Sequence, residues 1–142
     1  MRVLVCGGRR YAESDVDQMA EIYFALRDIH EQTPISALIQ GGATGADQCA
    51  ARLAKELGIK VVTVPADWRT HGKAAGPIRN QRMIDDFRPD LVLAFPGGRG
   101  TADMVARATA SGIPVRHPVR EPAVTVSGEP SDAVPSDPAN SA

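Results

Sequence analysis

Short apolar runs alternate along the chain with longer stretches in which apolar residues recur every three or four positions. Such runs are typical of buried parallel strands, and the longer stretches are typical of amphipathic helices. We expect strands at residues 3–6, 35–40, 60–64, 91–95 and 113–117, and helices at about 14–30, 46–57, 77–87 and 102–111. This alternation predicts an α/β protein, in which helices cover both faces of a parallel sheet.

Three of the expected strands run directly into glycine-rich loops, at residues 7–10, 41–47 and 96–101. Glycine lets the backbone turn tightly and approach a ligand, and the first turn of a following helix offers N–H groups to an anion such as phosphate. Taken alone, each loop is equally well explained as a simple turn. If the strand order is 3-2-1-4-5, the three loops meet outside the carboxyl ends of the strands, where such sheets bind ligands. We therefore predict a doubly wound, Rossmann-like fold of about five strands with a binding pocket at that edge.

Composition narrows the class of protein further. The chain has 142 residues, 43% of them hydrophobic and 23% charged, which suits one ordinary globular domain. Its formal net charge of -1 argues against a general nucleic-acid surface or an anionic membrane surface. No stretch is typical of a signal peptide or a membrane span, so we expect a cytoplasmic protein. Cys6 and Cys49 lack metal-ligand spacing, and we predict that both are reduced core residues and that there is no dedicated metal site.

The character of the chain changes near its end. We assign residues 1–118 to one nucleotide-binding domain, because strand and helix patterns continue up to that point. Residues 119–142 are rich in proline, serine and aspartate and poor in large apolar side chains, which predicts a disordered tail. Such a tail either engages a partner or remains solvated without a role.

The candidate ligand-binding residues come from the three loops and from the polar stretch at residues 65–80. They are Gly7, Gly8, Arg9, Gly41, Gly42, Thr44, Gly45, Asp47, Trp68, Lys73, Arg79, Asn80, Pro96, Gly97, Gly98, Gly100 and Thr101. We expect backbone N–H groups of the second and third loops to contact phosphate. The hydroxyl of Thr101 is a further phosphate contact, and Thr101 is also expected to cap the helix that follows.

Several of these side chains have two explanations. Arg9 and Lys73 neutralise phosphate oxygens or are ordinary solvated cations. Trp68 stacks on a base or anchors its loop to the core. Asp47 binds a ribose hydroxyl or stabilises the helix dipole. Asn80 orients a ligand or caps a turn, and the sequence does not decide between them.

Five ordered motifs resemble the YspA-type branch of the SLOG superfamily, and the resemblance covers about residues 1 to 117. The motifs are Gly41-Gly42-Ala43-Thr44-Gly45-Ala46-Asp47, Pro65-Ala66-Asp67-Trp68, Gly72-Lys73-Ala74-Ala75-Gly76, Arg79-Asn80 and Ala94-Phe95-Pro96-Gly97-Gly98-Arg99-Gly100-Thr101. The resemblance implies a Rossmann-like domain that binds nucleotides or nucleotide-derived ligands.

The superfamily also includes the Lonely Guy phosphoribohydrolases, which release a base from a nucleoside monophosphate. Their Pro-Gly-Gly-x-Gly-Thr-x-x-Glu motif is similar to residues 96–101, and their Arg-x-x-x-Met segment is similar to Arg79 to Met83. Their motif glutamate falls on Met104, whose thioether cannot transfer a proton or stabilise an oxocarbenium ion. If this chain cleaves a nucleotide, the resemblance implies that Arg79 binds the phosphate of that nucleotide. The carboxylate would then be Asp47, Asp67 or Asp103.

Three functions follow from the sequence, and whether the protein is an enzyme stays open. The leading hypothesis is a nucleotide-binding module or sensor. The second is a nucleotide N-glycosidic hydrolase or transferase, and the third is an interaction protein whose glycine loops are purely structural. Mg²⁺ is the metal that would accompany bound phosphates. We expect a homodimer or a higher homo-oligomer, and no membrane partner.

Overall fold

The computed structural model describes residues 1–118, which form a parallel five-stranded sheet in the order β3-β2-β1-β4-β5. The strands are β1 (Arg2–Cys6), β2 (Ala37–Gln40), β3 (Val61–Thr63), β4 (Leu91–Ala94) and β5 (Val115–Arg116). The predicted α/β class and doubly wound order are confirmed. The predicted disordered tail, residues 119–142, lies outside the described residues.

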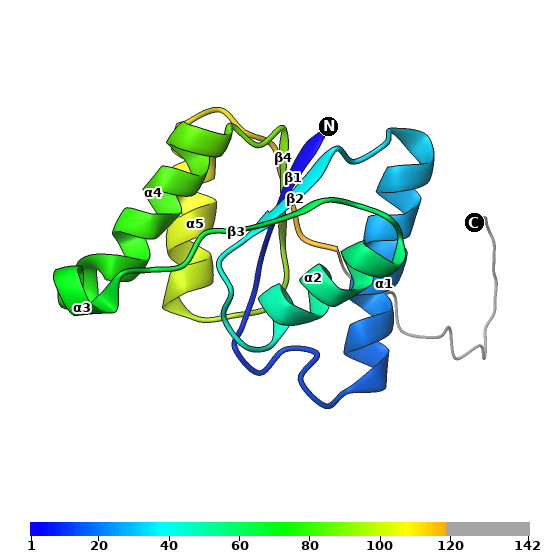
Figure 1. Ribbon diagram of the computed structural model, residues 1–142, viewed down its shortest axis with the longest axis horizontal. Coiled ribbons are helices and arrows are strands. Elements are labelled where there is room, and N and C mark those ends of the chain that lie inside the picture. The colour runs from blue at the N-terminus through cyan, green and yellow to red at the C-terminus, as the bar shows by residue number, and fades with distance from the viewer. Residues whose placement is uncertain (119–142) are drawn as a thin grey trace, which may run out of the picture.

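Helices cover both faces of this sheet (Figure 1). On one face lie α1 (Val16–Gln32) and α2 (Ala46–Glu56), which pack against each other. On the other lie α4 (Ala75–Phe87) and α5 (Arg99–Ala110), preceded by the short α3 (Trp68–His71) and the 3-10 turn η1 (Gly72–Ala74). No helix within residues 1–118 is long and apolar enough to cross a membrane.

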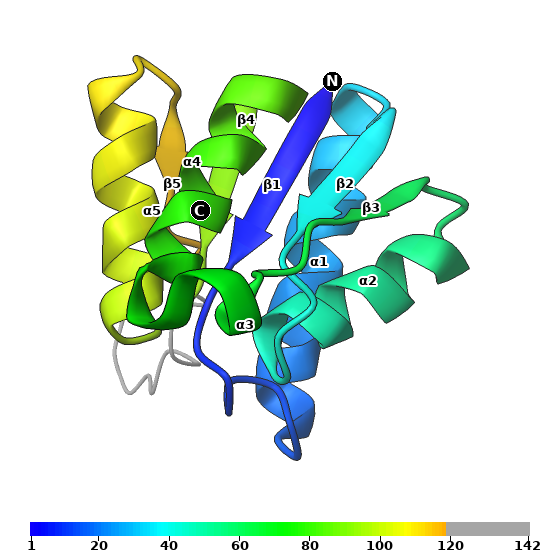
Figure 2. The ribbon, with the colours of Figure 1, turned by 60° about the vertical axis from the view of Figure 1, so that its left-hand side comes forward.

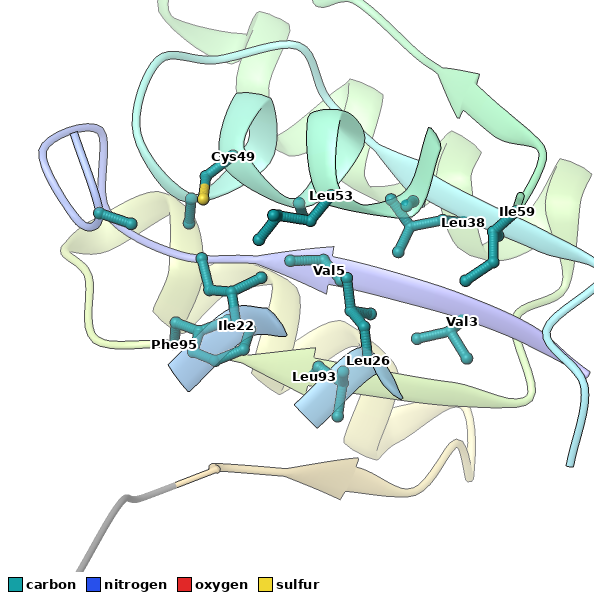
Figure 3. Close-up of a cluster of buried hydrophobic side chains, with 14 of the residues drawn as sticks. Val3, Val5, Ile22, Leu26, Leu38, Cys49, Leu53, Ile59, Leu93 and Phe95 are labelled. Atoms are coloured by element: carbon teal, nitrogen blue, oxygen red, sulfur yellow. The ribbon is translucent and has the colours of Figure 1, made fainter. Parts of the chain in front are cut away.

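The core consists of two apolar layers that the alternating side chains of β1 separate. Val3 and Val5 pack in the layer toward α1 and α2, whereas Leu4 and Cys6 pack in the layer toward α4 and α5. Figure 3 shows the first layer, in which Cys49 of α2 lies with the strand residues. Because both faces of β1 are covered, its interior residues are almost all apolar. Cys6 and Cys49 are buried and form no disulfide, as predicted.

Two local predictions were wrong. The stretch 65–76, for which the sequence predicts no helix or strand, contains α3 and η1, and Asp67 caps α3 by accepting a hydrogen bond from the Thr70 N–H. Pro77 lies third in α4 rather than first, a place it can occupy because no N–H in a first turn has a partner within the helix.

Thr101 does not cap α5, because the helix begins earlier than its sequence suggests. Gly98 is the N-cap and makes no side-chain hydrogen bond, so Thr101 is the third helical residue. Asp15 does cap α1, where its side chain accepts a hydrogen bond from the Gln18 N–H.

Candidate functional site

The loops after β1, β2 and β4 meet at the carboxyl edge of the sheet. The Gly8 N–H donates to the Pro96 carbonyl at 2.8 Å, and the Ala46 N–H donates to the Gly8 carbonyl at 3.2 Å. A Cβ on Gly97 would lie 2.7 Å from the Gly8 nitrogen, and one on Gly45 would overlap the Arg9 backbone. These glycines therefore have a structural role, because they let the loops approach one another.

Gly98 and Gly100 differ from the other loop glycines. A Cβ on either would meet nothing within 4 Å, and neither residue has a positive φ. Gly100 lies inside the first turn of α5, where glycine costs about 1 kcal/mol relative to alanine. Neither protein packing nor a left-handed backbone conformation therefore requires glycine at these two positions.

The first turn of α5 has unused hydrogen-bond donors. Among the described residues, no protein acceptor faces the backbone N–H groups of Arg99, Gly100 and Thr101. The positive end of the helix dipole lies at the same place. Figure 2 shows this start of α5, together with α3, at the end of the sheet toward which the arrows of β1 and β2 point.

A cavity of about 630 Å³ opens at this edge, within the size range of small-molecule sites. It is lined by residues from β1, from the three loops and from the α3–α4 segment. Among them are these predicted residues: Gly7, Gly8, Arg9, Asp47, Trp68, Lys73, Arg79, Asn80, Gly98, Gly100, Thr101 and the alternative carboxylate Asp103. Arg99 also lines it, although the sequence analysis gave it no role. Its position inside the Pro-Gly-Gly-Arg-Gly-Thr motif was the available signal.

The remaining predicted residues lie elsewhere. Gly41, Gly42 and Thr44 line a smaller cavity of about 330 Å³ that shares Arg9, Ala43, Trp68 and Arg79 with the larger one. Pro96 and Gly97 line a groove of about 490 Å³ between α5 and His117. Gly45 lines none of the three.

The second loop does not present its backbone donors to the large cavity. The N–H groups of Gly41 and Ala43 donate to Oδ2 of Asp47 at 3.1 and 3.3 Å. The Gly42 N–H donates to Oε1 of Gln40, a buried side chain that the sequence analysis did not single out. The sequence did contain a signal for the role of Gln40, because it is a polar residue at the end of an otherwise apolar strand. The side chains of Asp47 and Gln40 therefore satisfy these backbone donors from within the protein.

Asp47 is the carboxylate whose environment is most unusual. Its exposed fraction is 7%, and burial raises its pKa to about 6, although the N–H groups of Ala43 and Gly41 and the charge of Arg79 oppose the rise. Within residues 1–118, its other oxygen, Oδ1, has no hydrogen-bond partner, and the residue lines the large cavity. The group therefore changes protonation close to neutral pH.

Arg79 ties the second loop to α4. Its Nη1 donates to the carbonyls of Gly41 and Val64 at 3.0 and 3.3 Å, and its Nε donates to Asn80 at 3.1 Å. A Cβ on Gly41 would overlap the guanidinium, so that glycine makes room for Arg79. Burial lowers the pKa of Arg79, Asp47 opposes the shift, and the neighbouring charge of Arg9 adds to it.

Asp103 and Asn80 form a fixed link between α4 and α5. Asn80 is buried and donates to the Gly100 carbonyl and to Asp103, at 3.2 and 3.0 Å. Asp103 also pairs with Arg107 at 2.8 Å. Burial raises the pKa of Asp103, but the hydrogen bonds from Arg107 and Asn80 outweigh it and lower the pKa below its ordinary value. Asp103 is therefore an ionised, tethered group.

Two other positions from the sequence analysis lie away from the cavity. Asp67 is exposed, and its pKa is lowered mainly by the hydrogen bonds from Thr70 that make it the cap of α3. Met104, at the position of the Lonely Guy glutamate, has no exposed surface and packs in the core beneath α5. Its thioether fills space between the helix and the sheet.

Trp68 and the surface cations border the site. Half of the Trp68 surface is exposed, and the residue lines both cavities, so it does not serve as a buried loop anchor. The side chains of Arg9, Lys73 and Arg99 make no ion pair within residues 1–118. The same residues contain no group of three or more His, Cys, Asp or Glu side chains that could hold a metal ion.

Fold and site together define a Rossmann-like α/β protein with an open cavity at the carboxyl edge of its sheet. The chain belongs to the YspA, cpYpsA-related SLOG family, whose model matches residues 1–71. It is 37% identical over 122 residues to the Gene 61 protein of Mycobacterium phage D29, covering 80% of this chain and 93% of that protein.

A solved structure shares the fold. The X-ray structure of TM1055, a Northeast Structural Genomics Consortium target, superposes with a TM-score of 0.61 at 23% identity. The match covers 81% of this chain and 72% of that one. Family and fold fit a role in binding or modifying a nucleotide-related molecule.

Proposed function

We propose that the protein binds a nucleotide or nucleotide-derived ligand in the 630 Å³ cavity, with a phosphate at the first turn of α5. One observation carries the proposal: free N–H groups of Arg99, Gly100 and Thr101 lie at the edge of a cavity that unpaired cations border. Helix N-termini favour anions through these donors and through the dipole. The open space at Gly98 lets a phosphate approach the backbone.

Side chains around the cavity supply the other contacts of the proposal. Arg9, Lys73 and Arg99 neutralise the charge of the phosphate, and a guanidinium can bind it through two parallel hydrogen bonds. The exposed ring of Trp68 offers a face on which a base can stack. The proposal also includes a cytoplasmic location and a homo-oligomeric state for the protein.

The test is a binding panel with a matched pair of variants. Wild-type protein is incubated with mixed nucleotides, including dinucleotides and cyclic forms, and the retained and free fractions are analysed by mass spectrometry. Gly98→Leu fills open space at the cavity and should abolish retention while the circular dichroism spectrum stays unchanged. Ser111→Leu, at the exposed opposite end of α5, should retain ligand normally. If wild type and Gly98→Leu retain equal amounts of nucleotide, the phosphate does not bind at the first turn of α5.

A second candidate function is cleavage of an N-glycosidic bond, and the environment of Asp47 is the observation that favours this function. Asp47 lines the cavity, its pKa is raised to about 6, and its Oδ1 has no hydrogen-bond partner among the described residues, which suits general acid or base work near neutral pH. Asp103 is tethered by Arg107, and Asp67 caps α3 at the surface. We therefore assign the proton transfer of this alternative to Asp47.

The cleavage alternative has its own measurement in the same panel. Free base or ribose phosphate would accumulate with wild-type protein and disappear with Asp47→Asn, while nucleotide retention persisted. Because the asparagine oxygen can still accept the N–H groups of Gly41 and Ala43, the loop should keep its shape. Retained intact nucleotide without free base would leave the binding module as the function.

A further inference from the structure

We infer that residues 67–74 form a lid, which closes over the cavity of about 630 Å³ when a nucleotide binds and brings Trp68 and Lys73 against that nucleotide. The lid consists of Asp67, α3 and η1. It serves the proposed nucleotide site, so the inference rests on the proposed function and adds a moving part to that site.

The lid contributes no side chain to the core. All eight of its residues are exposed, which is the longest such run within residues 1–118, and α3 and η1 contain no buried residue. The flanks of the lid differ, because Val64 and Ala75 have exposed fractions of only 3% and 1%. A segment that buries little apolar surface opens at a low cost in free energy, whereas its buried ends stay in place.

The hydrogen bonds of the lid are local. The N–H groups of Thr70 and His71 donate to oxygens of Asp67, at 3.1 and 3.0 Å. In the described part of the chain, no hydrogen bond or ion pair joins the lid to the sheet or to the three glycine-rich loops. Figure 1 shows α3 at the outer edge of the molecule, where it packs against η1 and α4. The lid can therefore move without breaking a bond to the sheet.

Gly72 gives the lid a point at which it can bend. It lies between α3 and η1 with a φ of +56°, and a Cβ there would meet nothing within 4 Å. Residues with a side chain rarely adopt such a φ, so the backbone conformation, and not packing, requires glycine at this position. Hinges are residues that absorb large changes in φ and ψ, and they are often small.

The lid carries two groups that lack a partner in the protein. Trp68 and Lys73 line the cavity, and within residues 1–118 neither the indole N–H nor the ammonium group has a hydrogen-bond or ion-pair partner. The Trp68 ring rests on α4, where a Cβ on Gly76 would lie 3.5 Å from its Cη2, but half of its surface is exposed. Stacking on a base covers this surface, and a phosphate pairs with the ammonium. Both contacts favour the closed lid, so nucleotide binding shifts the lid toward closure.

Amide hydrogen exchange, followed by NMR on the full chain, tests whether the lid moves. In the free protein, the hydrogen-bonded amides of Thr70 and His71 should exchange about tenfold or more faster than amides in the middle of α4. The probes are AMP, GMP, CMP, UMP and the corresponding diphosphates, and titration calorimetry identifies which of them bind. A saturating nucleotide should slow the lid amides and leave α4 unchanged. Lid amides that exchange as slowly as α4 in the free protein would overturn the inference.

Fluorescence tests closure, because Trp68 is the one tryptophan of the chain. With the same nucleotides at saturation, its emission should move to shorter wavelength and acrylamide should quench it less. The physical reason is that closure removes the exposed half of the ring from water. Emission and quenching that do not change on binding would contradict closure.

Two glycine variants form a matched pair. Gly58 follows α2 with a φ of +76°, a Cβ there would also meet nothing within 4 Å, and it lines neither cavity beside the lid. Alanine is strained at both positions, so Gly72→Ala and Gly58→Ala should lose similar stability. Only Gly72→Ala should weaken nucleotide binding, by about tenfold or about 1.4 kcal/mol, and lose the fluorescence shift. Equal nucleotide affinity in the two variants would contradict the hinge.

The outcomes separate the lid from the proposed function. Nucleotide binding in the calorimeter without a change in exchange or fluorescence of the lid would overturn the lid and leave the proposed function intact. Failure of every nucleotide to bind wild-type protein would overturn both. If Gly72→Ala does not fold, as judged by circular dichroism, amide exchange in wild type with and without nucleotide decides the question.

Discussion

At the scale of single residues, Asp47 is the group around which the site is built. Its carboxylate accepts the N–H groups of Gly41 and Ala43, and its neighbour Arg79 holds the carbonyl of the same Gly41. One side chain therefore fixes the shape of the second loop from inside. The same residue lines the cavity, and its Oδ1 has no hydrogen-bond partner within residues 1–118, so it connects the shape of the loop with the proposed chemistry of the site.

The raised pKa of Asp47 predicts a pH dependence of stability. Between its ordinary value of 3.8 and about 6, the folded state binds more protons than the unfolded state. The contribution of Asp47 is therefore most favourable at low pH and declines as the pH rises to about 6, by about 2 to 3 kcal/mol. Urea unfolding of wild type and Asp47→Asn from pH 4 to 7 measures this as a change in their difference. A difference that stays constant with pH would contradict the raised pKa.

The buried position of Met104 predicts what happens when the glutamate of the Lonely Guy motif is placed there. Met104→Glu places a carboxylate at a position with no exposed surface in the core, so we expect a loss of about 3 kcal/mol or more. Met104→Leu keeps the packing and should cost less than about 1.5 kcal/mol. Denaturant unfolding compares the two, and mass spectrometry follows base release. Near-native stability of Met104→Glu together with base release would show that this position reaches the cavity.

At the scale of elements, the three loops form one unit with two kinds of glycine. Gly45 and Gly97 allow backbone to pack against backbone, whereas Gly98 and Gly100 face open space. The sequence shows all of them as the same residue type in similar loops. Only the positions of neighbouring chain segments separate a glycine needed for packing from one that leaves room for a ligand.

Adjacent glycines in the third loop give a matched test of this distinction. Gly97→Ala forces a Cβ to 2.7 Å from the Gly8 nitrogen and should destabilise the fold by about 2 kcal/mol or more. Gly98→Ala meets nothing within 4 Å and should change stability by less than about 0.5 kcal/mol. Thermal and denaturant unfolding of the two variants measures the contrast. Similar losses in both would mean that the loops do not pack as described.

The sequence predicts the elements well and the hydrogen-bond partners poorly. Apolar periodicity locates β1 to β5 and the main helices, because buried strands and amphipathic helices have different repeats. It does not show that Asp47 satisfies the N–H groups of the second loop, although the partners lie only six and four positions away, because packing against the first loop helps to set the conformation of the second loop. For the same reason it placed the start of α5 at Thr101 instead of Gly98. Hydrogen-bond partners depend on tertiary packing, which a local pattern does not encode.

At the scale of the whole molecule, net charge and local charge differ. The formal net charge is -1, yet Arg9, Lys73, Arg79 and Arg99 gather at one cavity. The overall balance therefore disfavours non-specific polyanion binding, while the local excess favours a small anion. The fold concentrates this charge because parallel strands bring the loops after β1 and β4, and the segment after β3 that contains Lys73 and Arg79, to a single edge.

We predict that residues 1–118 fold and bind nucleotide without the residues that follow them. Among the described residues, two apolar core layers and the three cavities named above are built from this range. Deleting residues 119–142 should therefore leave the thermal midpoint and the nucleotide affinity of the protein unchanged. Differential scanning calorimetry and titration calorimetry on the full and shortened chains measure both. A lower midpoint or weaker binding would show that the last 24 residues contribute to the domain. An unchanged domain that loses a partner from cell extract would instead assign those residues to an interaction, which is the role that the third hypothesis gives them.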